Sequence, residues 1–219
     1  MKWRSVPPAL RARAGRRQLG RSAAPPTHTS PTMPLTPLRR RKLSRMFAVL
    51  DLDGDGFVGR ADFLRRVEAF ARLRGWGADA PEYLRNRNAS LEEWQGLCQG
   101  ADVDDDGRVS RDEFLAYADT FLADRDAVRA YARGDVQLLF DAMDTDGDGV
   151  ISTDEYRAYL EVCGVETDAA DAFFLHAALD RDGRITRTEM SHAMEEFLVS
   201  DDPRAGGNFL FGDLGTGDA

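Results

Sequence analysis

Acidic side chains are crowded into three short windows of the sequence, and in each window they follow the same spacing. The windows span residues 51–62, 102–113 and 144–155, with Asp at the first, third and fifth positions and an acidic residue at the twelfth. Carboxylates this close repel one another unless a cation lies among them. Calcium takes about six to eight oxygen ligands, many of them from carboxylates. The spacing therefore predicts three calcium sites, named loops one, two and three below.

The expected ligands follow from position within the loop. Side chains at positions 1, 3, 5 and 12 and the backbone carbonyl at position 7 supply oxygen, and a water often serves position 9. Glycine at position 6 allows the sharp turn that brings these oxygens together. The expected ligands are Asp51, Asp53, Asp55, Phe57 and Asp62 in loop one; Asp102, Asp104, Asp106, Arg108 and Glu113 in loop two; and Asp144, Asp146, Asp148, Val150 and Glu155 in loop three.

Loop one departs from the pattern at two positions. Asp62 stands at position 12 and is one methylene shorter than the Glu of the other two loops, and Gly59 stands at position 9. We therefore expect loop one to bind calcium more weakly than the others. Magnesium is a possible competitor there, because its octahedral geometry needs fewer carboxylate oxygens.

A fourth window, residues 178–189, is a damaged copy of the same pattern and is named loop four. Ala178 replaces the first Asp, whereas Asp180, Asp182 and Glu189 remain. Because one ligand is lost, we expect loop four to be a structural partner for loop three, with metal binding as the alternative.

Apolar residues at helical spacing flank the loops. Leu43, Met46, Phe47 and Leu50 precede loop one at i, i+3, i+4 and i+7, which is the stripe of a helix with one buried face. Comparable stripes accompany the other loops. The repeated unit is therefore a helix, an acidic loop and a second helix. Four such units predict a compact all-α fold.

The spacing of the loops predicts two lobes. Residues 35–124 hold the first pair of units and residues 125–200 the second, with a junction near residues 123–134. The long interval between loops one and two contains an insertion near Gly75 and a helix that begins near Pro81. An apolar residue stands at position 8 of every loop. This predicts two short antiparallel contacts, Val58 with Val109 and Ile151 with Ile185.

The two ends of the chain lack the repeat. Residues 1–34 are basic and rich in Arg, Ala and Pro, without helical or strand periodicity, and we expect them to be disordered. They are an arm for nucleic acid or an anionic membrane, a transit peptide, or translated sequence ahead of a start at Met33 or Met46. Residues 201–219 form a Gly-rich tail whose apolar residues 209–211 either dock onto the body or stay exposed.

Charge and composition limit the function classes. Residues 1–50 contain no Asp or Glu and 12 of the 29 Lys and Arg, so the remainder holds 17 basic and 38 acidic residues. An acidic body favours cations over nucleic acid as partners. No apolar run approaches the ~18 residues of a membrane span, and no nucleophile, phosphate-loop or cofactor motif indicates an enzyme. Cys98 and Cys163 lack redox or metal spacing, so we expect buried thiols in a cytoplasmic protein.

The repeated units are EF-hand motifs, and over roughly residues 36–200 the chain resembles the sarcoplasmic calcium-binding proteins and their bacterial relative calerythrin. This resemblance implies a compact calcium buffer that does not open to grip target helices, with Asp51, Asp102 and Asp144 as first ligands. The helical body contains few Met residues, which also favours a buffer. The alternative is a calcium sensor that exposes an apolar groove to a protein partner.

Overall fold

The computed structural model describes residues 35–177, 183–212 and 214, so the expectations for residues 1–34 lie outside it. The described part is mostly helical with only short strands, which confirms the all-α prediction. The helices are α1 Pro37–Leu50, α2 Arg60–Arg74, α3 Pro81–Ala101, α4 Arg111–Leu122, α5 Arg125–Met143, α6 Thr153–Val162, α7 Ala169–Ala177 and α8 Arg187–Val199. The short strands are β1 Phe57–Val58, β2 Val109–Ser110, β3 Val150–Ser152 and β4 Arg184–Thr186.

The helices after loops two, three and four begin with reciprocal hydrogen bonds between the cap residue and the position-12 acid. At α4, the backbone N–H of Ser110 donates to Glu113 Oε2 at 2.9 Å, and the N–H of Glu113 donates to Ser110 Oγ at 3.4 Å. Helices α6 and α8 begin in the same way. At α2 the cap is Gly59, so only the bond from its N–H to Asp62 Oδ2 remains, at 2.8 Å. Each position-12 acid therefore starts a helix as well as completing its loop.

The loops pair through their position-8 residues, as the sequence predicts. Strand β1 is antiparallel to β2 with Val58 opposite Val109, and β3 is antiparallel to β4 with Ile151 opposite Ile185. All four of these side chains are fully buried. The first hand is therefore tied to the second, and the third to the fourth.

The connections between helices agree with the sequence in one place and differ in another. Helix α3 begins at Pro81, where proline fits the first helical position. The junction expected near residues 123–134 is shorter than predicted, because α5 already begins at Arg125. Asp124 causes this early start, since its carboxylate accepts the N–H groups of Asp126 and Ala127 at 3.1 and 3.0 Å.

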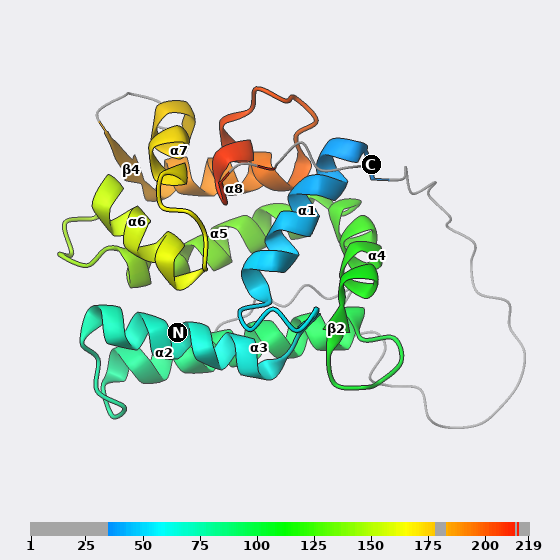
Figure 1. Cartoon of the computed structure of the whole chain (residues 1–219), viewed down its shortest axis with the longest axis horizontal. Coiled ribbons are helices and arrows are strands. Elements are labelled where there is room, and N and C mark those ends of the chain that lie inside the picture. The colour runs from blue at the N-terminus through cyan, green and yellow to red at the C-terminus, as the bar shows by residue number, and fades with distance from the viewer. Residues whose placement is uncertain (1–34, 178–182, 213, 215–219) are drawn as a thin grey trace, which may run out of the picture.

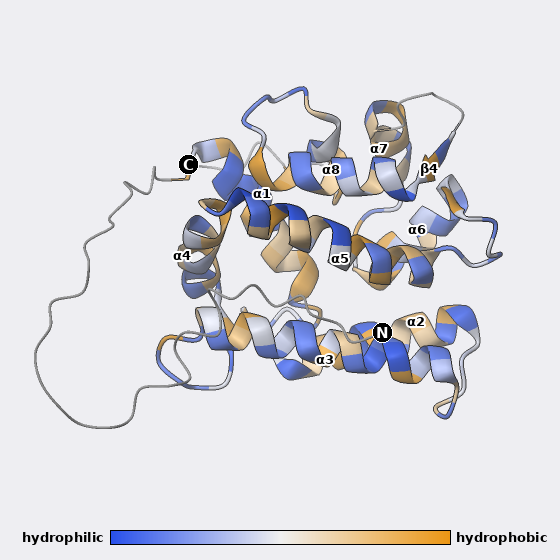
Figure 2. Cartoon of the chain, turned by 180° about the vertical axis from the view of Figure 1, so that it is seen from behind, coloured by the Kyte–Doolittle hydropathy of each residue, from blue (hydrophilic) through white to orange (hydrophobic). Residues whose placement is uncertain are grey.

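The two pairs of hands share one continuous hydrophobic core. Helix α1 contacts α4 in its own pair and α8 in the other pair, and α2 contacts α6. Figure 1 shows α2 and α3 side by side along one side of the molecule and α8 on the opposite side. In Figure 2, polar and apolar residues are interspersed along α5 and α8, as in helices that bury one face. None of the described helices is long and apolar enough to cross a membrane.

The tail docks onto the body, which answers the question left open by the sequence. Residues Gly206–Phe209 form a short 3-10 helix, and Leu210 and Phe211 are buried. A Cβ atom on Gly207 would lie 2.3 Å from the carbonyl oxygen of Ala193, so only glycine allows this close approach to α8. The tail contacts α7 and α8 and covers part of the second pair of hands.

A buried lysine joins the start of the described chain to this tail. Lys42 of α1 donates from Nζ to the carbonyl oxygens of Glu196 and Ser200, at 3.1 and 2.7 Å, and to Asn208 Oδ1 at 3.1 Å. Burial lowers the pKa of Lys42 to about 8. Three acceptors satisfy the three donors of the ammonium group, so the contact holds α1, α8 and the tail together.

Candidate metal centres

Carboxylate oxygens converge in all three intact loops. In each, one oxygen atom from positions 1, 3 and 12 lies within 4.8 Å of the others, which brings together most of the predicted side-chain ligands. The three groups are Asp51, Asp53 and Asp62; Asp102, Asp104 and Glu113; and Asp144, Asp146 and Glu155. These hard oxygen donors suit calcium or magnesium.

The position-5 carboxylates and the position-7 residues complete the set of predicted ligands. The position-5 carboxylates turn toward their own loops: Asp148 Oδ1 accepts the N–H of Val150 at 3.0 Å, and Asp55 and Asp106 accept from Phe57 and Arg108 at 2.9 and 2.8 Å. The position-7 residues stand at the strands, with Phe57 and Val150 opening β1 and β3 and Arg108 directly before β2.

The first aspartate of each loop organises the backbone around the site. In loop three, Asp144 accepts the N–H groups of Gly147 and Gly149 at 2.7 and 3.2 Å. The position-6 glycine has φ of 86° here, a left-handed conformation that side chains rarely adopt. Loops one and two repeat this bond, from Gly56 to Asp51 and from Gly107 to Asp102, both at 3.0 Å. The chain is thus folded into the loop shape by its own hydrogen bonds.

The position-12 acids differ in a way that separates loop one from the others. Hydrogen bonds from the N–H groups of Val103 and Ser110 lower the pKa of Glu113. Burial alone would raise the pKa of Glu155, but bonds from Ser152 and Thr145 outweigh it and lower the pKa. Burial raises the pKa of Asp62, despite the bond from Gly59. Hydrogen bonds thus favour the charged form of the two glutamates, whereas burial disfavours the charged form of Asp62.

An arginine that the sequence analysis did not identify lies against the loop-one ligands. Arg65 Nη1 is 2.5 Å from Asp53 Oδ2 and 3.2 Å from Asp62 Oδ1, so it forms ion pairs with two predicted ligands. The sequence does contain a signal for this contact, because Arg65 follows Asp62 by three residues and such residues are neighbours on a helix. In loop three an arginine pairs with one predicted ligand instead of two, since Arg184 of β4 is 2.9 Å from Asp148.

Substitution Arg65→Gln should therefore strengthen calcium binding at loop one. A metal must displace the guanidinium from Asp53 and Asp62, and removal of an exposed ion pair corresponds to a gain of about two- to fivefold in affinity. The amide resonance of Gly56 reports this loop in a calcium titration followed by NMR. Arg60→Gln, an exposed position on the same helix, is the control. An unchanged or weaker affinity in Arg65→Gln would show that Arg65 does not compete with the metal.

Loop four is only partly described. Ala178, Asp180 and Asp182 lie outside the described residues, so metal binding at loop four stays an untested alternative. The described part serves as the expected partner of loop three, because β4 pairs with β3. Its position-12 residue, Glu189, is buried and accepts the N–H and hydroxyl of Thr186 at 2.9 and 2.7 Å.

Family models match both halves of the molecule. The model of an EF-hand domain pair matches residues 40–118, and that of an EF hand matches residues 136–160. These ranges contain loops one and two and loop three, which are the three loops with complete acidic groups.

Known proteins with similar sequences or folds bind calcium. The beta chain of a sarcoplasmic calcium-binding protein from Penaeus sp. is 34% identical over 65 residues, and the match spans 29% of this chain and only 34% of that relative. A calcium-binding protein from Streptomyces coelicolor is 27% identical with a TM-score of 0.64, over 73% of this chain and 97% of that one. The amphioxus sarcoplasmic calcium-binding protein has the same fold, with a TM-score of 0.68 at 22% identity, over 82% and 99% of the two chains. The repeated units of this chain are therefore EF-hand domains, and the chain resembles the sarcoplasmic calcium-binding proteins.

Proposed function

We propose that the protein is a cytoplasmic calcium buffer, which takes up about three calcium ions with little change of shape. The observation that carries this proposal is that the tail covers an apolar face of the second pair of hands. Leu210 and Phe211 of the tail are buried against the second pair of hands, and Lys42 ties α1 to α8. A sensor needs such faces to become free for a partner. Free thiols at Cys98 and Cys163 are in keeping with a reducing compartment.

The three sites are not equivalent in this proposal. Loops two and three have Glu at position 12, whose side chain is one methylene longer than that of Asp62, and we assign them the tighter calcium binding. Loop one has the shorter Asp62 and the competing Arg65, and we assign it weaker calcium binding with magnesium as a competitor. No catalytic role is proposed, because the clustered carboxylates are assigned to metal.

Fluorescence of a hydrophobic dye tests the buffer against the sensor. The full chain is mixed with the dye in chelator, in magnesium and in calcium, and the intensities are compared. A buffer gives similar intensity in all three conditions, because its apolar faces stay covered. A large rise that occurs only with calcium would overturn the buffer and support a sensor.

The sensor is the second candidate, and one feature of the structure favours it. An apolar cavity of about 410 Å³ lies among α1, α3, α4 and α5, with the rings of Phe114, Tyr117, Phe121 and Tyr131 among its lining. Such a cavity is a starting point for a groove that widens when calcium binds. The Streptomyces coelicolor protein is described as acting in calcium-mediated regulation, which points in the same direction.

A further inference from the structure

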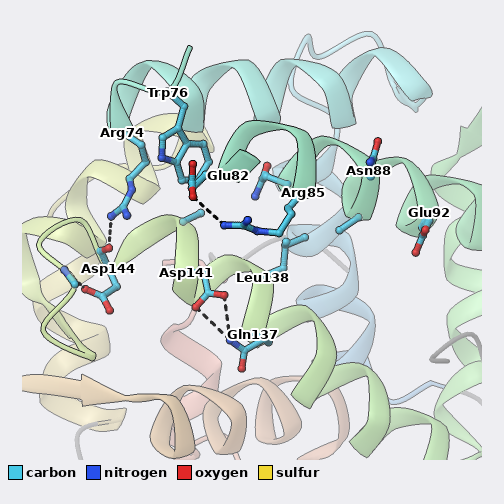
Figure 3. Close-up of a pocket in the computed structure, with 14 residues that line it drawn as sticks. Arg74, Trp76, Glu82, Arg85, Asn88, Glu92, Gln137, Leu138, Asp141 and Asp144 are labelled. Carbon is cyan, nitrogen blue, oxygen red and sulfur yellow. Dashed lines mark hydrogen bonds and ion pairs between the residues drawn. The ribbon is translucent and has the colours of Figure 1, made fainter. Parts of the chain in front are cut away.

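The last residue of α2 contacts the first ligand of loop three, although the two belong to different pairs of hands. The guanidinium of Arg74 donates a hydrogen bond to the backbone carbonyl oxygen of Asp144, which Figure 3 shows at the edge of the cavity between α3 and α5. Asp144 is also the C-cap of α5 and is 8% exposed. The contact therefore lies where a helix ends and a metal loop begins.

The C-terminal end of α2 holds the Arg74 side chain close to the carbonyl oxygen of Asp144. Gly75 adopts a left-handed conformation with φ of 65°, and the next N–H, from Trp76, bonds to the carbonyl of Ala71 at 2.9 Å. The chain then turns so that the Trp76 ring lies 5.5 Å from the Arg74 guanidinium carbon. A helix end fixed in this way and an aromatic face beside the cation both restrict the arginine.

A second contact joins α2 to the other helix of the third hand. Phe70, one turn before Arg74, stacks on Tyr159 of α6, with ring centroids 6.1 Å apart and planes 6° from parallel. Both rings are buried. Helix α2 thus touches the hand on both sides of loop three, at the end of α5 through Arg74 and on α6 through Phe70.

The opposite end of α2 carries a predicted ligand of loop one. Asp62 lies in the first turn of this helix and belongs to the loop-one carboxylate group. A cation bound by Asp62 would therefore be attached to the same helix that ends at Arg74. The cavity of about 560 Å³ beside this end, lined in part by Trp76, Leu138 and Gly147, leaves room for a small shift.

We propose that α2 couples calcium binding at loop one to calcium binding at loop three, with Arg74 as the positioning residue. The inference rests on the proposed function, since it concerns how two calcium sites communicate. Arg74 fixes the carbonyl of Asp144, while the N–H of Asp144 is held by the Phe140 carbonyl at 2.8 Å. A ligand whose backbone is already ordered loses less entropy when the metal binds. Coupling between two binding sites is reciprocal, so calcium at loop three also favours binding at loop one.

The test is a calcium titration of the full, isotope-labelled chain, with each site followed separately. The amides of Gly56, Gly107 and Gly149 donate to the first carboxylate of loops one, two and three, so each resonance reports its own loop. We expect Asp51→Asn, which disables loop one, to weaken loop three by about fivefold, within the usual range of coupling between sites. Arg74→Met should weaken loop three similarly. When Asp51→Asn is added to Arg74→Met, the calcium affinity of loop three should fall by less than a further factor of about two.

Two matched variants separate positioning from general charge or stability effects. Arg72→Met removes an exposed arginine of the same helix end and should leave loop three unchanged. Arg74→Lys keeps a cationic donor and should restore part of the affinity lost in Arg74→Met. The proposal is overturned if Arg74→Met behaves like Arg72→Met, or if Asp51→Asn weakens loop three equally in both backgrounds. If none of the three glycine amide resonances changes when calcium is added, the result instead contradicts calcium binding by the loops.

Discussion

Calcium at a hundredfold excess over the dissociation constants of the loops should raise the free energy of unfolding by about 2.7 kcal/mol for each filled loop, or about 8 kcal/mol for three. The reason is that the folded chain gathers carboxylates in each loop, whereas the unfolded chain does not form these sites. Urea unfolding followed by circular dichroism, in calcium and in chelator, measures the difference.

Substitution within loop three provides the control for this prediction. Glu155→Gln removes one anionic ligand, and the calcium-dependent gain should fall by about one loop's share, about 2.7 kcal/mol. Glu161→Gln neutralises an exposed acid on the same helix and should keep the full gain. Equal stability of the unsubstituted protein with and without calcium would contradict the account.

Phe211→Ala should destabilise the protein by about 3–5 kcal/mol, the range for removal of a buried aromatic side chain. Phe211 is 4% exposed and packs edge-on against Phe197 of α8, with ring centroids 5.0 Å apart. The backbone carbonyl of Phe211 also accepts from Arg45 Nε at 2.8 Å, and that bond survives the substitution. Thermal or urea unfolding of the calcium-loaded protein gives the value.

A surface substitution of similar chemistry tests whether this effect comes from burial. Leu175 of α7 is 72% exposed, so Leu175→Ala should change stability by no more than about 0.5 kcal/mol. Phe211→Ala should also increase binding of a hydrophobic dye in chelator, because the tail no longer covers α8. A loss below about 1 kcal/mol for Phe211→Ala would mean that the tail does not dock in solution.

The features that follow from a regular or strongly local sequence pattern were predicted from the sequence. The acidic positions 1, 3 and 12 of each loop lie within twelve residues, and hydrogen bonds inside that span fold them together. The pairing of Val58 with Val109 follows from the same regularity, since apolar residues recur at one loop position. The start of α3 at Pro81 rests on a single strong local preference.

Of the features that were missed or left open, two depend on contacts between distant segments, and two others had a local signal. Arg74 and Asp144 are 70 residues apart, and nothing near either residue indicates their contact. The tail had an apolar segment, but its docking depends on the close approach of Gly207 to α8. The early start of α5 had a local signal in Asp124, which a mixed charged segment obscured. The contact of Arg65 with Asp62 could also be predicted locally, because the two residues are three positions apart on one helix.

Isothermal titration of the metal-free full chain with calcium, with and without magnesium, tests the central claim most directly. The account predicts about three bound calcium ions, with two binding events that magnesium barely affects and a weaker one, at loop one, that magnesium suppresses. A chain that binds no calcium at micromolar concentrations would contradict it.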